Sequence, residues 1–406
     1  MRRTHCSVWL LVTIALFGLG TPAPAANQIL VGFDNQTWLD QAADFLDYFA
    51  KKYPDITVEV TTGINQENIL VMMAGGSTPD VYYVRGTWSR GFIEQGLLEL
   101  LDPYIQASGF DLSDYNAVML SAYQNEAGQT FALPTDLGMV FTYLNTDHLA
   151  EAGIAFPSND WTWDEALAMA QRLTLVEGES LTRYGWTVSL GAGWRFEATA
   201  VVPWGGRLFN DTETETWVTQ PEAINGLLWW ENALALVRSG GDFTAGTSSM
   251  LFDGSWRLAH FNTLLVDVNW DIVPMPVGPV MRATPTQGSG YGISPLSSNK
   301  DAAWTFLQEF LGPTGQAMIW ARGSTPTARS ALPVFLEQTM SGKNHAAIYD
   351  AFNSVFIGRP IMPPGEGAFV QGASGPISNW LERRISSQQL ALQLKTVIEA
   401  MWLQRK

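Results

Sequence analysis

The side chains of this sequence that could do chemistry are mainly aromatic rings and hydrogen-bonding groups. The chain has 17 Trp among its 406 residues. An indole ring offers a flat apolar face with an N–H at its edge, and Asp, Asn, Arg and Glu offer directed hydrogen bonds. Together these groups suit a ligand that has apolar faces and a polar rim, as a neutral sugar does. Packing in the core is the structural alternative for every Trp.

Twelve residues are candidates for a binding site because they follow predicted strands or lie near predicted crossing segments. They are Asn35, Arg85, Trp88, Asp136, Trp194, Trp204, Gly205, Trp256, Arg257, Tyr291, Arg322 and Glu366. For Trp204 and Trp256 the core and the site are equal alternatives. Arg85 and Arg257 could instead pair with acidic neighbours, and Asp136 could brace a hinge between two halves of the chain.

Motifs for other chemistry are incomplete. His148, His260 and His345 are isolated and lack the spacing of metal ligands. The glycine-rich segment 288–292 lacks the G-x-S-x-G pattern of a serine nucleophile, and Gly75–Gly76 is not followed by the Lys of a phosphate loop. No metal and no cofactor are therefore expected. The 39 Asp and Glu leave one catalytic alternative, a glycoside hydrolase that uses two carboxylates.

The elements that must position these side chains alternate between strand and helix. Strands are predicted over 28–33, 56–60 and 80–84, and helices over 36–53 and 68–74. This order is typical of an α/β fold with a mainly parallel sheet, in which ligands bind at the carboxyl ends of the strands. The loops after Phe33, Val84 and Leu133 are therefore the expected site loops.

The segment 130–173 predicts a connection between two halves of the chain. Pro134 cannot donate to a sheet, so it interrupts the strand pattern, which resumes at Val140. Thr162 and Glu165 then form a capping box that opens a helix. A return crossing is predicted at about 270–276, before the segment 291–294, and a third crossing near 312–313. Trp230 lies on a helical face with aliphatic neighbours and is predicted to be core.

The first 25 residues predict a secretory signal peptide. Arg2 and Arg3 precede an apolar run from Val8 to Leu19, and Ala23–Pro24–Ala25 is typical of a cleavage site. A membrane anchor is the alternative, but this run is shorter than the roughly 18 to 20 residues that span a bilayer. Cys6 precedes the apolar run, so it is badly placed to carry a lipid and is expected to leave with the peptide.

The charge of the chain disfavours a nucleic-acid partner. The formal net charge is −16, from 23 basic and 39 acidic residues. Without the two signal-peptide arginines, 21 basic and 39 acidic residues give −18. Polyanion binding needs clustered Lys and Arg, and the sequence has no such run. We interpret the acidity as a solvated surface that favours solubility.

Several short motifs resemble, in order, those of the family 1 extracellular solute-binding proteins. These are the maltose-binding-protein-like, sugar-capturing receptors of bacterial ABC importers. The motifs are Met73–Val81, Gly96–Ile105, Ala132–Asn145, Trp161–Glu165, Trp204–Gly206, Phe252–Trp256, Pro274–Pro279, Gly288–Ser294 and Ala303–Leu307. Each is weak by itself, but their number, order and spacing behind a signal peptide make the resemblance specific.

The resemblance implies an α/β fold of two lobes, the type II periplasmic binding protein fold, with hinge segments that cross between them. The lobe boundaries that follow are 26–135 with about 276–315, and 136–275 with about 316–406. A carbohydrate or polyol would bind between the lobes, drive hinge closure and pass to the transmembrane subunits of an ABC permease. A periplasmic monomer without catalytic activity is expected. A glycerophosphodiester ligand, a secreted hydrolase and a two-lobed sensor receptor are the alternatives.

Overall fold

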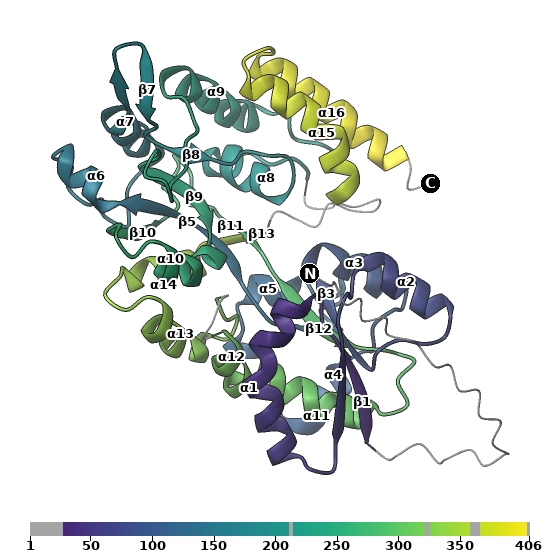
Figure 1. Cartoon of the computed structure of the whole chain (residues 1–406). Helices are drawn as coiled ribbons and strands as arrows, with labels where there is room; N and C mark the ends of the chain where they lie inside the picture. Colours follow the sequence, from purple (N-terminus) through teal and green to yellow (C-terminus); the bar gives the residue numbers. More distant parts are fainter. Residues whose placement is uncertain (1–26, 211–213, 321–324, 358–365, 404–406) are drawn as a thin grey trace, which may run out of the picture.

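The structure is a computed structural model that describes residues 27–210, 214–320, 325–357 and 366–403. The predicted signal peptide and Arg322 lie outside these ranges. Within them, no helix is long and apolar enough to cross a bilayer. The chain forms two mixed sheets, each with its own covering helices, and the two layers are separate in Figure 1.

The first sheet is built mainly from the N-terminal part of the chain. Its strand order is β2 (Thr57–Thr61), β1 (Gln28–Gly32), β3 (Val81–Arg85), β12 (Ser289–Ile293), β4 (Ala132–Pro134). The helices on this side are α1 (Gln36–Lys52), α2 (Gln66–Ala74), α3 (Gly86–Glu94), α4 (Asp102–Ser108), α5 (Ala117–Ser121), α11 (Lys300–Leu311) and α12 (Pro313–Trp320). Helices α1 and α11 pack against the strands and against each other (Figure 1).

The second sheet has the order β13 (Val355–Ile357), β11 (Thr284–Gln287), β5 (Gly138–Asn145), β9 (Met250–Gly254), β8 (Thr187–Val188), with β10 (Trp270–Pro274) also paired to β5. A hairpin, β6 (Leu175–Glu177) with β7 (Ser180–Arg183), stands apart. The helices on this side are α6 (Thr146–Glu151), α7 (Trp163–Leu173), α8 (Trp194–Ala200), α9 (Pro221–Leu236), α10 (Leu258–Leu264), α13 (Leu332–Thr339), α14 (His345–Asn353), α15 (Glu366–Leu381) and α16 (Ser387–Leu403).

Local sequence explains the helix starts that matter for the site. Asn35 caps α1, because its side chain accepts a hydrogen bond from the backbone N–H of Trp38 at 3.2 Å. The predicted capping box of α7 is confirmed, since Thr162 and Glu165 each accept from the other's backbone N–H. Trp230 on α9 is fully buried, as its helical spacing predicted.

The chain passes between the sheets at two closely spaced points, and a third time between β12 and β13, where the passage follows α12 and so comes later than the one predicted near 312–313. It leaves β4 at Pro134 and enters β5 at Gly138, as the sequence predicted. It returns between β11 and β12, at Gly288. This return comes later than the predicted one near residue 276. The reason is that β10 pairs antiparallel with β5 and so remains in the second sheet.

The expectation of mainly parallel sheets is wrong. In the first sheet β1 pairs in parallel with β2 and β3, whereas β12 is antiparallel to both β3 and β4. In the second sheet β9, β10 and β11 are all antiparallel to β5. In the first sheet the physical reason is the connection between sheets: β12 returns from the second sheet and enters from the opposite end, without the crossover helix that a parallel neighbour needs.

Candidate ligand-binding site

A cavity of about 340 Å³ lies where the crossing segments meet the first sheet. Its lining comes from the start of α1, the end of β3, both crossing segments and the short helix η3 (Ser255–Arg257) that follows β9. The lining residues are Asp34, Thr37, Trp38, Gln41, Tyr83, Arg85, Asp136, Gly138, Trp256, Gln287, Gly288 and Ser289. The cavity thus contains three charged groups, three aromatic rings and several uncharged polar groups.

Hydrogen bonds join the two crossing segments beneath the cavity. The backbone N–H of Ser289 donates to Asp136 Oδ1 at 2.8 Å, and the N–H of Thr135 donates to the Ser289 carbonyl at 2.8 Å. Gly288 must be small, because a Cβ there would lie 2.3 Å from the Asp136 carbonyl oxygen. The Ser289 hydroxyl pairs with the Tyr83 hydroxyl at 2.7 Å. Asp136 therefore braces the crossing and also lines the cavity.

The charges of the cavity are coupled. Burial raises the pKa of Asp136 to about 7, against the lowering effects of the Ser289 hydrogen bonds and of Arg85. For Arg85, desolvation opposes the charge, but Tyr83, Asp34 and Asp136 outweigh it and hold its pKa above the ordinary value. Arg85 is therefore charged at neutral pH, whereas Asp136 exchanges a proton near pH 7.

Aromatic rings line both sides of the cavity. Trp38 and Tyr83, on the first-sheet side, pack edge to face with centroids 5.6 Å apart. Trp256, on the second-sheet side, has the guanidinium carbon of Arg195 at 5.0 Å from its ring centre. All three rings belong to different elements, so tertiary folding alone brings them together.

Of the twelve predicted site residues, Arg85, Asp136 and Trp256 meet in this cavity. Arg85 is the last residue of β3, Asp136 lies between β4 and β5, and Trp256 follows β9. Two of the loops singled out from the sequence, those after Val84 and Leu133, supply the first two. The third such loop supplies Asp34 rather than the predicted Asn35.

Four predicted residues are not part of the cavity lining. Asn35 is the N-cap of α1. Trp88 packs against Tyr83 with centroids 5.9 Å apart and lies under Arg85. Trp204 is only 8% exposed and packs against Trp163 and Trp229. Gly205 is exposed, with a left-handed φ of 84°. Their part in binding stays a prediction.

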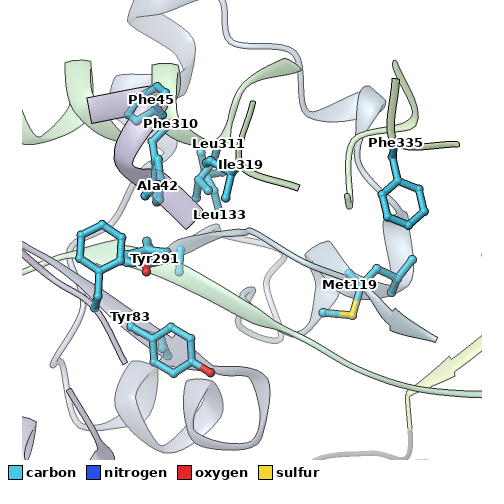
Figure 2. Close-up of a cluster of buried hydrophobic side chains, with 14 of the residues drawn as sticks. Ala42, Phe45, Tyr83, Met119, Leu133, Tyr291, Phe310, Leu311, Ile319 and Phe335 are labelled. Atoms are coloured by element: carbon cyan, nitrogen blue, oxygen red, sulfur yellow. The ribbon is translucent and has the colours of Figure 1, made fainter. Parts of the chain in front are cut away.

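Two further predicted residues contact other parts of the protein: Arg257 forms an ion pair, and Tyr291 packs in a hydrophobic cluster. Arg257 Nε donates to Asp253 Oδ2 at 2.9 Å, so the alternative of an acidic neighbour is confirmed. Tyr291 is fully buried, and Figure 2 shows it in the hydrophobic cluster close to Tyr83 and Leu133. Its binding role also stays a prediction, as do those of Trp194 and Glu366, whose side chains are not described, and of Arg322.

Sequence reasoning missed more than half of the cavity lining. The missed residues are Asp34, Thr37, Trp38, Gln41, Tyr83, Gly138, Gln287, Gly288 and Ser289. For two of these residues, the position in the sequence could have indicated the site. Asp34 directly follows the first predicted strand, and Trp38 lies in the first turn of the next predicted helix. No signal was available for Gln287 and Ser289, because the register of β11 and β12 was not predicted.

The family model for bacterial extracellular solute-binding proteins matches residues 35–317 of this chain. The chain belongs to the bacterial extracellular solute-binding protein family. The matched range contains almost the entire cavity lining, from Thr37 to Ser289. The predicted family is confirmed.

Known relatives support the family and the fold. A maltotriose-binding protein of Pyrococcus abyssi is 25% identical over 277 residues, which are 63% of this chain and 56% of that protein. The chain therefore spans little more than half the length of this relative. The sugar-binding protein MalE of Xanthomonas citri superposes with a TM-score of 0.80 at 21% identity, covering 93% of this chain and 98% of that structure.

A second solved structure has the same fold. It is an ABC substrate-binding protein of Listeria monocytogenes in complex with cycloalternan, with a TM-score of 0.76 at 21% identity. The alignment covers 92% of this chain and 98% of that structure. The two-lobed type II fold predicted from the sequence is confirmed by these similarities.

Proposed function

We propose that this family member binds a neutral carbohydrate or a related polyol between its two lobes. The observation that carries the proposal is the cavity at the crossing, which combines Trp and Tyr rings with Asp34, Arg85 and Asp136. Rings can stack on the C–H faces of a sugar, while the charged groups hydrogen-bond its hydroxyls. Charge-assisted bonds of this kind contribute about 1.5 to 3 kcal/mol each.

Charge in the cavity favours a neutral ligand over an anionic one. The two carboxylates, Asp34 and Asp136, face one guanidinium, Arg85, and that guanidinium already interacts with both. A phosphate or carboxylate ligand would meet two acidic groups for one basic group. This balance argues against the glycerophosphodiester alternative. The sugars named for relatives, maltotriose and cycloalternan, are uncharged, in keeping with this choice.

Binding is proposed to couple to closure of the lobes about the crossing segments. The first lobe would comprise residues up to about 135 with about 288–320, and the second lobe the remaining parts of the mature chain. Closure must be driven by contacts made only in the closed state. Shifting a two-state equilibrium from about 1:99 to 99:1 needs roughly 5.5 kcal/mol, which a few polar contacts and one or two stacked rings can supply.

The closed protein would then act as a monomer that delivers its ligand to the transmembrane subunits of an ABC permease. Export by the predicted signal peptide would place it in the periplasm. Small-angle scattering tests the closure step. The radius of gyration should decrease on saturation with ligand, and an unchanged value would contradict closure.

One observation favours a second function, a glycoside hydrolase. Asp34 and Asp136 line the same cavity, and the pKa of Asp136 is raised to about 7, as a general acid requires. Family membership favours binding over catalysis. Incubation with chromogenic glycosides distinguishes the two, because turnover that is lost in Asp136→Asn would establish an enzyme.

The decisive experiment is a thermal-shift screen of the mature chain against mono-, di- and oligosaccharides, polyols and glycerol phosphodiesters, followed by calorimetry. A ligand at 100 times its dissociation constant should stabilise the fold by about 2.7 kcal/mol. An uncharged sugar that binds and remains intact is the expected result. Binding only of phosphorylated compounds, or of nothing in the panel, would contradict the proposed ligand class.

A further inference from the structure

The ring of Trp256 lies against two glycines from neighbouring strands of the second sheet. A Cβ added to Gly254 would lie 2.1 Å from ring atoms Cη2 and Cζ3, and one added to Gly138 would lie 3.1 Å from Cζ3. The backbone of Gly254, at φ −90° and ψ 167°, is one that any residue can adopt. Glycine at 254 therefore makes room for the ring and does not relieve backbone strain.

Arg195 restrains the same ring from another element. It lies on α8, and its guanidinium carbon is 5.0 Å from the Trp256 ring centre. Arg195 does not line the cavity, whereas Trp256 does. Its Nη2 donates to Asp253 Oδ1 at 2.9 Å, and its side chain is about one-fifth exposed. The Arg195 guanidinium thus supports the Trp256 ring from outside the cavity.

Asp253 connects these restraints. Its Oδ1 accepts from Arg195 and also from the backbone N–H of Gly254 at 2.8 Å, while its Oδ2 accepts from Arg257 at 2.9 Å. The residue is only 8% exposed. A shielded carboxylate with three donors has little rotational freedom, and charge-assisted bonds of this kind are stronger than neutral ones. One side chain therefore fixes both the guanidinium on the ring and the backbone under it.

We propose that Asp253 is a positioning residue for the cavity: through Arg195 and Gly254 it holds the Trp256 ring in one orientation toward a ligand. The ligand part of this inference rests on the proposed function, but the orientation of the ring does not. An aromatic wall that is already ordered loses little conformational entropy when a ligand binds, so positioning contributes to affinity. Arg257, predicted as a ligand contact, would serve in this support.

The first arm of the test needs no ligand. The indole N–H signal of Trp256 is assigned in a ¹H–¹⁵N spectrum by its loss in Trp256→Phe. Asp253→Asn and Gly254→Ala should each displace that signal, the first by releasing Arg195 and the second by occupying the space of the ring. If Asp253→Asn does not fold, Arg195→Lys replaces it, because a lysine keeps the charge without the planar guanidinium.

Matched controls separate positioning from a general loss of stability. Gly375→Ala adds a methyl group where nothing lies within 4 Å of the new Cβ. Glu151→Gln breaks another ion pair, to Arg183 at 2.6 Å, on the second lobe. Both controls should leave the Trp256 signal unchanged. A lower unfolding temperature with an unmoved Trp256 signal in both test variants would overturn the proposal.

The second arm measures affinity by calorimetry with maltotriose as the probe, or with the sugar that the thermal-shift screen identifies. Asp253→Asn and Gly254→Ala should weaken binding about tenfold, the size of an aromatic contact of about 1.4 kcal/mol. Displaced signals with unchanged affinity would refute the contribution to binding. If the wild type binds no sugar, the proposed function fails, while the indole arm still decides whether Asp253 positions the ring.

Discussion

The two walls of the cavity use charge in different ways. On the first-lobe wall, Asp34 and Arg85 are themselves part of the lining, beside Trp38 and Tyr83. On the second-lobe wall, Trp256 lines the cavity together with the uncharged Gly138 and Gln287, and the charged groups Arg195, Asp253 and Arg257 lie next to Trp256 without entering the cavity. The first wall presents charged groups to a ligand, whereas the second presents a supported ring beside uncharged residues.

A charged residue near a cleft can therefore either contact the ligand or support a residue that does. Burial and partners distinguish these two cases. Arg85 is charged within the cavity and interacts with the lining residues Asp34 and Asp136. Arg257 instead shares Asp253 with Arg195, outside the lining. The comparison predicts that substitutions behind the second wall change stability or ring position, and that substitutions in the first wall change the chemistry of binding.

The largest expected effect is on stability, from Trp204→Ala. Trp204 is 8% exposed and packs against Trp163 and Trp229 in the hydrophobic core of the second lobe. Truncation of a large buried aromatic residue costs about 3 to 5 kcal/mol because it leaves a cavity. Urea unfolding measures this loss. Near-normal stability with lost sugar binding would instead make Trp204 a ligand contact, as the sequence allowed.

A comparable effect is expected on the pH dependence of stability. The titration of Asp136 should change the unfolding free energy of the wild type by about 4 kcal/mol, and Asp136→Asn should remove this change. The folded pKa of Asp136, about 7, lies above its ordinary value of 3.8, and each unit corresponds to about 1.4 kcal/mol. A raised pKa means that the native state binds the proton more tightly. Its contribution to stability is therefore complete below about pH 4 and is lost as pH rises to 7.

Urea unfolding of the ligand-free protein at pH 4, 5.5 and 7 checks this expectation. The wild type should lose stability over this interval, and Asp136→Asn should lose much less. Asp55→Asn, at an exposed position, is the matched control and should follow the wild type. Parallel curves for wild type and Asp136→Asn would show that Asp136 titrates normally in the folded protein.

In the first wall, Arg85→Ala should weaken sugar binding by 1.5 to 3 kcal/mol, or about 10- to 150-fold, because a charge-assisted donor is lost. Calorimetry with the sugar found in the screen measures it. Arg172→Ala is the control and should bind normally, because Arg172 lies on α7 outside the cavity lining, where its guanidinium donates to the carbonyls of Ala152 and Gly153. An equal loss in both variants would argue against a direct contact by Arg85.

The smallest expected effect is the loss of a stacking ring in Trp256→Ala. Binding should weaken about tenfold, and unfolding free energy should change less than in Trp204→Ala, because Trp256 is half-buried at the cavity. Calorimetry and urea unfolding on both variants give the comparison. A larger stability loss in Trp256→Ala than in Trp204→Ala would contradict the assignment of Trp256 to the cavity wall and of Trp204 to the core.

Much of the fold follows from local patterns. The βαβαβ start, the capping box of Thr162 and Glu165, and the buried face of Trp230 are short-range features, set by periodicity and capping. The crossing at 134–138 was also predictable, because Pro134 interrupts a strand pattern. The position of the return was not, since 270–274 and 284–293 both resemble strands, and only their pairing with β5 and β3 separates them.

The family, the α/β class, the loops at the strand ends and, within them, Arg85 and Asp136 could all be predicted from the sequence. Which residues share one cavity became apparent only from the packing of the elements in three dimensions. This packing placed Asp34 and Trp38 beside Arg85, brought Ser289 to Asp136, and put Trp204 in a core and Trp256 at the wall. The physical reason is that composition and periodicity report burial and direction along one element. Contacts between distant elements depend on strand register. A shift of the register by one residue would move every side chain of a strand to the opposite face of the sheet.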